Sequence, residues 1–227
     1  MIGIFDSGVG GKISLYEIRR LLPRADIVYL ADRKNAPYGT KSPSEILRLV
    51  SEDIRRLRER GAEKILIACC TASTVWERLS ESEREISLPI IRPAALTAAR
   101  VSGGAVTVIA TEATVKSGAF KAEIKRLSGA LTVTEIAAQE LVSLVEGGAA
   151  DGRLTPRDIK IITATAERIK ETKADTLVLG CTHFSHLEKT LEALTGAKTV
   201  SPAKEGAMAL AREPAARKNE GGRVIYS

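Results

Sequence analysis

The sequence predicts two pseudo-symmetric three-layer α/β domains with mainly parallel sheets. Short apolar runs alternate with amphipathic helical patterns along the chain, an order typical of parallel strands covered by helices on both faces. Aromatic residues make up only 4% of the chain while Ala, Ile, Val and Leu abound, which suits helices packed on strands. Two strand-and-turn motifs recur 104 and 112 residues later in the same order, so we expect two related halves.

The expected elements follow one another with helix signals at their ends. Ser42 precedes Pro43, and Thr155 precedes a proline with an acid three residues after the cap, as at helix N-termini. Gly61 ends the second helix. The predicted strands are 2–5, 27–30, 64–68, 88–91, 105–109, 131–135, 176–179, 198–200 and 223–226. The predicted helices are 11–22, 43–60, 72–84, 94–102, 113–127, 137–146, 155–172, 184–194 and 204–212.

Length and hydropathy limit the class of protein. The 227 residues are 44% hydrophobic, enough for one large core or two small ones. No run approaches the roughly 18 apolar residues that a membrane span needs. The N-terminus is typical of a strand and lacks a basic signal-peptide region, so we expect a cytoplasmic protein without a membrane partner.

The basic charge indicates solvated helix faces. The net charge is +6 and the isoelectric point is near 9.3. The Lys and Arg residues cluster in helical stretches that also carry Glu and Asp three or four positions away, a spacing that forms local ion pairs. No aromatic residues are interleaved with them, so we expect no nucleic-acid partner. A mild positive excess suits an anionic substrate.

The first strand ends in Asp6 and Ser7, followed by the glycine-rich run "GVGG". Such a run suits a tight turn or a close approach of a ligand to the backbone. "DSGVGG" does not match GxGxxG and lacks the P-loop Lys-Ser/Thr. A nucleotide- or phosphate-binding protein is therefore a weak alternative.

The three cysteines form neither a disulfide framework nor a zinc motif, since Cys69 and Cys70 are adjacent and Cys181 stands alone. They are small buried residues or reactive thiols. In the repeated motifs "KILIACCTAS" and "TLVLGCTHFS", a cysteine follows an apolar strand and precedes a helix. A helix N-terminus is expected to lower a thiol pKa. Two such thiols across a cleft favour two-base racemisation, in which one removes a proton and the other returns one.

A family resemblance is carried by "FDSGVGG", "YLADRKNAPYGTKS", "IACCTAS", "VIATEATVKSGAF", "LVSLVEGG" and "LVLGCTHF". These motifs occur in the order found in glutamate racemases, and the chain resembles that family of the cofactor-independent aspartate/glutamate racemase superfamily over residues 2 to about 207. The resemblance implies an isomerase that interconverts L- and D-glutamate in a cleft between two domains. It implies a role in peptidoglycan and cell-wall biogenesis, and so in cell shape. It also implies no metal and no pyridoxal phosphate or other cofactor.

The resemblance also implies residue roles. Cys69 would deprotonate D-glutamate, assisted by Asp6, and Cys181 would deprotonate L-glutamate, assisted by Glu146 and His183. The residues implied in holding the amino acid are Ser7, Pro37, Tyr38, Gly39, Cys70, Thr71 and Thr182. Thr111 lies in the matching loop of the second half and is assigned a site role only secondarily. We expect structural roles for His186 and Trp76.

The resemblance implies a division of the chain as well. Residues 1–92 with 208–227 would form the half that carries Cys69, and residues 93–207 the half that carries Cys181. The final "RVIYS" would return as the last strand of the first half. The small-molecule partner would be glutamate, and a homodimer stays open.

Some positions depart from the family pattern. Cys70 stands where Asn is usual, and Ala138 with Gln139 stands where Cys-Pro is common. The region after residue 207 is shorter than usual. These departures keep two alternatives open, an aspartate or broader amino-acid racemase and a non-catalytic binding protein on the same fold.

Overall fold

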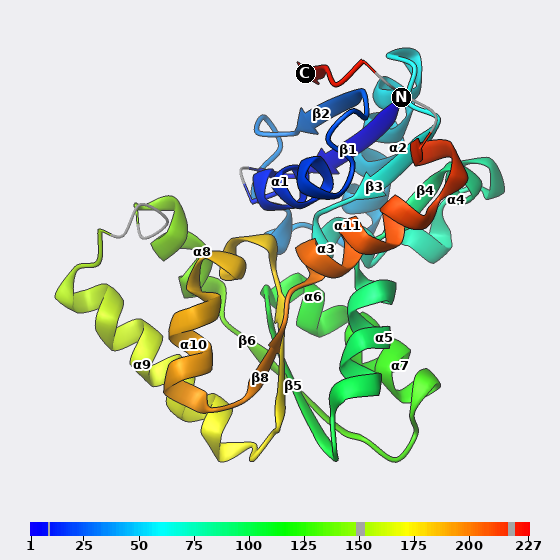
Figure 1. Cartoon of the computed structure of the whole chain (residues 1–227). Helices are drawn as coiled ribbons and strands as arrows, with labels where there is room; N and C mark the ends of the chain where they lie inside the picture. The colour runs from blue at the N-terminus through cyan, green and yellow to red at the C-terminus, as the bar shows by residue number, and fades with distance from the viewer. Residues whose placement is uncertain (9, 149–152, 218–220) are drawn as a thin grey trace.

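The structure, a computed structural model, describes residues 1–8, 10–148, 153–217 and 221–227. These residues contain a five-stranded sheet, in the order β4-β3-β1-β2-β9, and a four-stranded sheet, in the order β6-β5-β7-β8. The strand pairs recorded in both sheets are parallel. Figure 1 shows each sheet in its own lobe with helices packed around it. The predicted α/β class is confirmed.

Each predicted strand forms within two residues of its expected bounds. The strands are β1 (Ile2–Asp6), β2 (Ile27–Ala31), β3 (Lys64–Ile67), β4 (Ser87–Pro89), β5 (Ala105–Ala110), β6 (Thr132–Ala137), β7 (Thr176–Gly180), β8 (Lys198–Val200) and β9 (Val224–Tyr226).

The two sheets have the same internal order. Taken in chain order within each half, β4-β3-β1-β2 corresponds position by position to β8-β7-β5-β6, and β9 is added beside β2. Strand β1 therefore corresponds to β5, and β3 corresponds to β7. These are the strands of the repeated motifs, so the weak sequence repeat reflects a shared topology.

The helices cover both faces of the two sheets. The α-helices are α1 (Lys12–Leu21), α2 (Pro43–Glu59), α3 (Cys70–Ser73), α4 (Glu81–Ile86), α5 (Ile91–Val101), α6 (Glu112–Ser117), α7 (Ala119–Leu127), α8 (Gln139–Glu146), α9 (Pro156–Glu171), α10 (Glu188–Thr195) and α11 (Pro202–Arg212). The 3-10 helices are η1 (Tyr38–Thr40), η2 (Trp76–Arg78), η4 (Thr182–Leu187) and η5 (Pro214–Arg217).

The predicted helix caps are present. The Ser42 hydroxyl accepts the Glu45 N–H at the start of α2, and Thr155 forms a capping box with Asp158 at the start of α9. After α2 the chain turns through Gly61, whose φ of +87° suits glycine.

Three predicted helices are interrupted, each for a local reason. The predicted helix 72–84 becomes α3, η2 and α4, because a capping box at Ser80 starts a new helix. The predicted helix 113–127 divides into α6 and α7 at Gly118, which has a left-handed φ of +64°. The predicted helix 184–194 starts earlier, as η4, and becomes α-helical only at Glu188.

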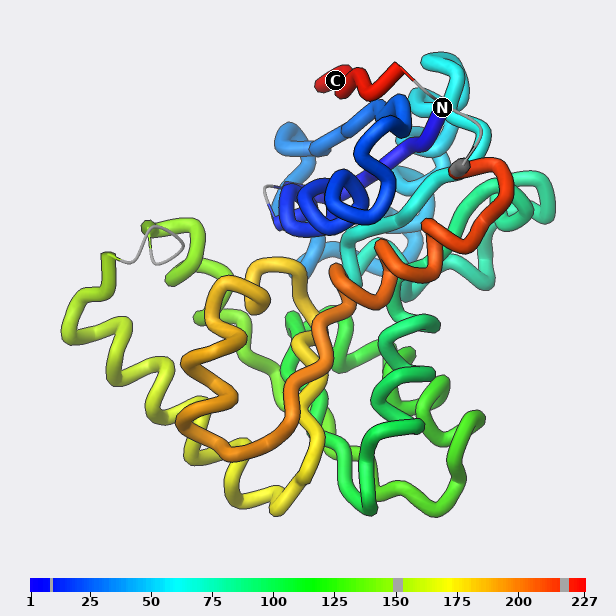
Figure 2. The backbone as a smooth tube through the Cα atoms, viewed as in Figure 1, coloured from blue at the N-terminus to red at the C-terminus, as the bar shows by residue number. Residues whose placement is uncertain are grey.

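Helices α5 and α11 join the two halves. Helix α11 packs against both α1 and α5, and Figure 2 shows it passing from one lobe to the other. One buried apolar cluster includes Ile4 of β1, Ala94 of α5, Val108 of β5 and Leu210 of α11. Burial of each large aliphatic side chain contributes about 1.5–3 kcal/mol, so this shared core ties the lobes together.

The predicted boundaries between the two halves of the chain fall within these joining helices. The two boundaries come after residues 92 and 207, inside α5 and α11. Strand β9 pairs with β2, which places the final strand in the first sheet. Both ends of the chain lie at the same end of the molecule in Figure 2. The exact division stays a prediction.

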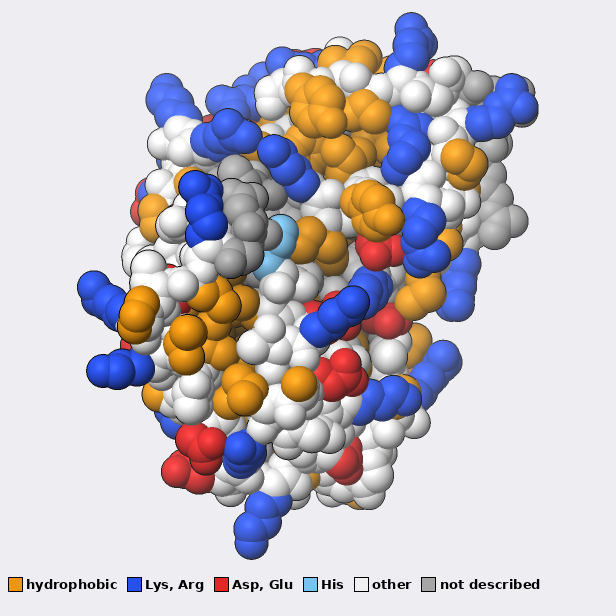
Figure 3. All heavy atoms as spheres, turned by 60° about the vertical axis from the view of Figure 1, so that its left-hand side comes forward, with side chains coloured by type: hydrophobic (Ala, Val, Ile, Leu, Met, Phe, Trp, Pro, Cys, Tyr) orange, Lys and Arg blue, Asp and Glu red, His pale blue; other side chains and the backbone are white. Residues whose placement is uncertain are grey.

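The charged side chains are spread over the surface. Ion pairs join neighbours on the helices, such as Arg48 with Glu52 and Arg55 with Glu59 on α2, as the spacing predicted. Figure 3 shows Lys and Arg side chains scattered over the face it displays. Within the described ranges, the longest apolar helices are too short or too polar to span a bilayer.

Candidate active site

The carboxyl ends of the central strands of both sheets meet at one pocket between the halves. Strands β1 and β3 end there from the first sheet, and β5 and β7 end there from the second. Ligands of parallel sheets bind at such ends. Counted together with the open solvent at its mouth, the pocket has a volume of about 420 Å³. It is lined by Ser7, Gly8, Ala36, Pro37, Tyr38, Gly39, Cys69, Cys70, Thr71, Thr111, Gln139, Val142, Glu146, Cys181, Thr182 and His183.

The structure brings together the predicted site residues with one exception. Those that line the pocket are Cys69, Cys181, Glu146, His183, Ser7, Pro37, Tyr38, Gly39, Cys70, Thr71 and Thr182. Asp6 is fully buried and is not among the lining residues. It therefore lies behind the pocket wall.

Cys69 is held by hydrogen bonds from the first half. It is the N-cap of α3, and its sulfur accepts the Ala72 N–H at 3.4 Å. The Ser7 hydroxyl lies 3.2 Å from the same Sγ. Both contacts favour the thiolate, because each can donate to a negative sulfur. A backbone amide and a hydroxyl, neither of which titrates near neutral pH, therefore surround this thiol.

Cys181 has a different partner. Residue 181 precedes the 3-10 helix η4 and makes no side-chain cap hydrogen bond. Its Sγ lies 3.5 Å from Nδ1 of His183. The Nε2 of His183 lies 3.2 Å from Glu146 Oε1, without the alignment of a hydrogen bond. The thiol, imidazole and carboxylate form a row that leads from the pocket toward the surface, where the Glu146 side chain is 49% exposed.

Burial raises the thiol pKa values instead of lowering them. Burial, followed by the nearby Asp6 charge, raises the pKa of Cys69 to about 11 against the hydrogen bonds from Ser7 and Ala72. Burial also raises the pKa of Cys181, and Cys69 and Asp6 add to the rise. The expected lowering of these pKa values is therefore wrong in sign, because desolvation of a buried thiolate outweighs the short helix end.

Asp6 and the glycine turn join the halves beneath the pocket. The Gly8 N–H donates to Asp6 Oδ1 at 2.8 Å, and the Thr182 hydroxyl donates to Oδ2 at 3.3 Å. Burial raises the pKa of Asp6, with opposing contributions from these donors and from His183. A Cβ at Gly10 would lie 2.2 Å from Thr182 Oγ1. Glycine is needed there because the turn packs directly on the second half.

The loop of residues 36–39 forms another wall. Its Ala36–Pro37 peptide bond is cis. The Tyr38 hydroxyl donates to Asp32 Oδ2 at 2.7 Å. Tyr38 thus anchors the wall with its side chain, while its backbone remains available to a ligand. Gly39 faces the second half, where a Cβ would lie 2.9 Å from Gln139 Oε1.

Three threonine hydroxyls form a triangle across the interface. Thr71 Oγ1 lies 3.0 Å from Thr111 Oγ1 and 3.1 Å from Thr114 Oγ1, and the last two lie 2.9 Å apart. Thr111 also caps α6. Thr111 therefore lines the pocket and connects the two halves. The sequence analysis gave it only a secondary role in the site.

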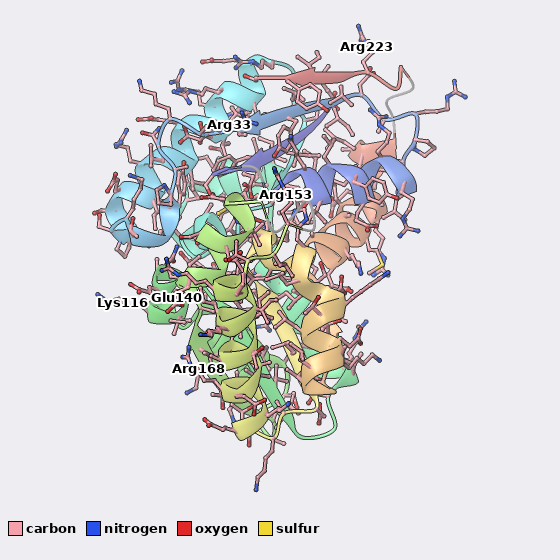
Figure 4. The ribbon with its side chains drawn as sticks, turned by 90° about the vertical axis from the view of Figure 1, so that its left-hand side faces the viewer. Arg33, Lys116, Glu140, Arg153, Arg168 and Arg223 are labelled. Carbon is pink, nitrogen blue, oxygen red and sulfur yellow. The ribbon has the colours of Figure 1, made fainter. Side chains whose placement is uncertain are left out.

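Helix α8 adds two lining residues that the sequence reasoning missed, Gln139 and Val142, beside the predicted Glu146. Gln139, Val142 and Glu146 have helical spacing along one face of α8 and line the pocket together. Gln139 Oε1 is buried without a hydrogen-bond partner among the described residues. The neighbouring Glu140 is exposed and is labelled in Figure 4. Residues 142 and 139 precede Glu146 by four and seven positions, a helical spacing that places them on the same face of a helix as Glu146.

The remaining cysteine and the two expected structural residues are also placed. Cys70 is buried and lines the pocket, and burial raises its pKa well above the usual value, with Cys181 and then Cys69 adding to the rise. Trp76 donates from Nε1 to Ser87 Oγ at 3.0 Å, outside this pocket. His186 is exposed and outside the lining residues. The cysteines at 69, 70 and 181 are free thiols.

The geometry suits proton transfer at a small anionic molecule. Two buried thiols from corresponding strand ends share one pocket, each with its own polar partners. Hydroxyls and backbone N–H groups at strand and helix ends can hold carboxylates. Among the residues that the structure describes, no group of three or more His, Cys, Asp or Glu side chains has an arrangement that could hold a metal ion.

Known proteins resemble this chain over most of its length. Residues 16–210 match the family described as Asp/Glu/Hydantoin racemase. The chain is 38% identical over 201 residues to a glutamate racemase of Desulforudis audaxviator, which covers 88% of this chain and 72% of that one. It is 38% identical over 207 residues to a glutamate racemase of Gloeobacter violaceus, which covers 89% and 76%.

Solved structures show the same similarity. The glutamate racemase isoform RacE1 of Bacillus anthracis has a TM-score of 0.88 at 28% identity, covering 100% of this chain and 86% of that one. An aspartate racemase of Picrophilus torridus has a TM-score of 0.64 at 18% identity, covering 92% and 91%. The second comparison establishes the common fold alone.

Proposed function

The chain belongs to the Asp/Glu/hydantoin racemase family, and we propose that it is a glutamate racemase that works through Cys69 and Cys181. The observation that carries the proposal is the pair of buried thiols that line one pocket from corresponding strand ends. Taken alone, this geometry indicates proton transfer at both faces of one carbon atom. The relatives that are named glutamate racemase indicate that the substrate is glutamate.

In the proposed reaction, one sulfur is a thiolate and the other a thiol. The Cys69 thiolate takes the α-proton of D-glutamate, so the Cα–H bond breaks and an S–H bond forms. The Cys181 thiol then gives its proton to the opposite face of the carbanion. The reverse sequence converts L-glutamate. Each cycle exchanges one proton for another and inverts the stereocentre, with no net oxidation or reduction.

The neighbouring residues adjust each proton transfer. The Ser7 hydroxyl and the Ala72 N–H stabilise the Cys69 thiolate through their hydrogen bonds. His183, backed by Glu146, lies where it can exchange a proton with Cys181. The α-carbon is very weakly acidic, and the raised pKa values of the thiols reduce the pKa difference between thiol and α-carbon. A thiolate formed here is therefore a stronger base than an exposed one.

Substrate binding is proposed for groups of both halves. Ser7, Thr182 and the backbone of residues 37–39 can donate hydrogen bonds to the carboxylates. The unpartnered Gln139 Oε1 is an acceptor and can take an N–H of the substrate ammonium. Cys70 and Thr71 complete this set at the start of α3.

The wider role is part of the same proposal. A D-glutamate product would serve peptidoglycan synthesis, and a cytoplasmic location and a homodimer remain predictions. An aspartate or broader amino-acid racemase is the second candidate, because the fold is shared with an aspartate racemase.

Deuterium exchange tests the reaction directly. L-Glutamate and L-aspartate are incubated with the protein in heavy water without added cofactor. NMR follows α-deuterium, and chiral chromatography follows inversion. We expect glutamate to acquire deuterium and invert, with aspartate slower by at least about tenfold. Faster aspartate turnover would favour the second candidate. Absence of exchange in both amino acids would contradict racemase activity.

A further inference from the structure

Two buried carboxyl groups flank the Tyr38 hydroxyl behind the pocket wall. Asp32 follows β2, Tyr38 begins η1 and Asp53 lies within α2. Their exposed fractions are 4%, 1% and 1%. The reaction proposed above does not use either carboxyl group. Buried acids are costly unless they are paired or protonated, so this cluster requires an explanation.

The hydrogen-bond distances favour a proton on one of the acids, because one phenol hydroxyl lies between two carboxyl groups. The Tyr38 hydroxyl oxygen lies 2.7 Å from Asp32 Oδ2 and 3.3 Å from Asp53 Oδ2. A phenol carries one proton and can donate it to only one carboxylate. The shorter contact goes to Asp32. The longer contact is favourable when Asp53 is protonated and donates to the phenol oxygen, and repulsive when Asp53 is ionised.

Burial and the neighbouring Asp32 charge favour the proton on Asp53, against the ion pair that Asp53 forms with Arg56. Asp32 accepts two N–H contacts from Asn35 at 2.9 and 3.0 Å, which suit a carboxylate. Asp53 accepts one N–H at 2.9 Å, from Arg56 of its own helix. Burial, followed by the Asp32 charge, raises the pKa of Asp53 to about 7 against Arg56 and Tyr38.

Titratable and charged groups on four segments act on this cluster. Asp32 follows β2, Tyr38 belongs to η1, Arg56 belongs to α2 and Cys69 follows β3. Burial and Asp32 also raise the pKa of Tyr38, so its phenol stays protonated at neutral pH. Asp53 is therefore the member of the cluster whose charge changes near neutral pH.

Tyr38 connects Asp53 to the wall of the pocket. Its two neighbours, Pro37 and Gly39, line the pocket beside Cys69. The Tyr38 carbonyl accepts the Lys41 N–H at 3.1 Å, which closes the η1 turn. The hydrogen bonds of the phenol therefore help to hold the part of the pocket wall that Pro37 and Gly39 form.

We propose that Asp53 is a positioning residue whose proton, donated to the Tyr38 hydroxyl, holds residues 36–39 against α2 as one wall of the site. When Asp53 ionises, the hydrogen bond is lost and two carboxylates face one phenol. The wall then loosens and the substrate binds less tightly. The kinetic consequence rests on the proposed racemase function, whereas the order of the wall does not.

The variant Asp53→Asn tests the proton. Its amide N–H replaces the carboxyl proton at every pH, and its carbonyl can still accept from Arg56. Hydrogen exchange of the Lys41 amide, corrected for intrinsic rate, measures the order of the wall. Between about pH 6 and about pH 8, we expect protection in the native protein to fall by roughly tenfold and protection in Asp53→Asn to stay level. In the same range, the KM for D-glutamate should rise about threefold only in the native protein.

Two further variants separate this role from a general structural one. Glu59→Gln makes the same acid-to-amide change on an exposed part of α2 and should follow the native protein in both measurements. Tyr38→Phe removes the shared hydroxyl and should lose protection at both pH values.

The outcomes decide the proposal. Equal pH dependence of protection in the native protein and Asp53→Asn would overturn it. A change in protection without a change in KM would also overturn it, because Asp53 would then titrate without positioning the site. If the native protein shows no racemase activity, the kinetic measurement rejects the proposed function. The hydrogen-exchange measurement still decides whether the Asp53 proton orders the wall.

Discussion

The two thiol ends of the pocket occupy equivalent positions but have different partners. Cys69 follows β3 and receives hydrogen bonds from the Ser7 hydroxyl and the Ala72 N–H. Cys181 follows β7 and faces His183, which in turn faces Glu146. The first end stabilises a thiolate with fixed donors. The second end adds a group that can itself take up or release a proton.

The difference originates in the turn that follows each strand. After β3 the chain enters an α-helical turn directly, so a first-turn N–H points at the Cys69 sulfur. After β7 it enters a 3-10 helix and offers no such cap. Topological symmetry therefore places the two sulfurs, while local backbone geometry selects their partners.

Loss of either thiol should have the largest effect. Cys69→Ala and Cys181→Ala should each lower racemisation by about a thousandfold or more, since a positioned base contributes roughly that factor. In heavy water, Cys181→Ala should still exchange the α-proton of D-glutamate, and Cys69→Ala that of L-glutamate. NMR of each enantiomer measures this split. Exchange of the same enantiomer in both variants would contradict the assignment of sides.

Cys70→Ala is the matched cysteine variant. It removes a third thiol from the same pocket and should lower racemisation by less than about tenfold, because the role proposed for Cys70 is contact with substrate and not proton transfer. A loss as large as that of Cys69→Ala would show that residue 70 provides the base.

Removal of the imidazole should have an intermediate and one-sided effect. His183→Asn should lower kcat/KM by about a hundredfold. The loss must be equal in both directions, because a racemase has an equilibrium constant of one. Deuterium uptake should slow more for L-glutamate than for D-glutamate. The exposed His186→Asn is the control, and equal slowing of both enantiomers would reject an asymmetric role.

Removal of a fixed donor should have the smallest effect. The Ser7 hydrogen bond lowers the pKa of Cys69, so Ser7→Ala should raise that pKa further and reduce the thiolate fraction at neutral pH. One such hydrogen bond is worth about 1 kcal/mol, or roughly a fivefold slower alkylation of Cys69. Mass spectrometry of iodoacetamide labelling against pH measures the shift. Ser44→Ala, on the exposed start of α2, is the control; an unchanged profile in Ser7→Ala would show that the contact carries no charge stabilisation.

The sequence predicted most of the fold because its signals are local. Apolar runs located the strands, and Ser42 and Thr155 located two helix starts. Gly118 is of a residue type that often ends helices, but the predicted helix 113–127 continued through it. The predicted site residues converged because strand-end motifs are brought together by parallel topology. Gln139 and Val142 were missed, although Val142 lies within the motif "LVSLVEGG", because they become site residues only when α8 lies against the pocket.

The sequence by itself determined the α/β class, the repeat, the resemblance to racemases and the strand-end positions of the thiols. Each of these depends on residue type and spacing along the chain. Only the tertiary structure decided the direction of the thiol pKa shifts, the place of Asp6 behind the wall and the partners of Tyr38. Those properties depend on desolvation and on distances between residues far apart in sequence, and both come into existence only when the two halves pack together.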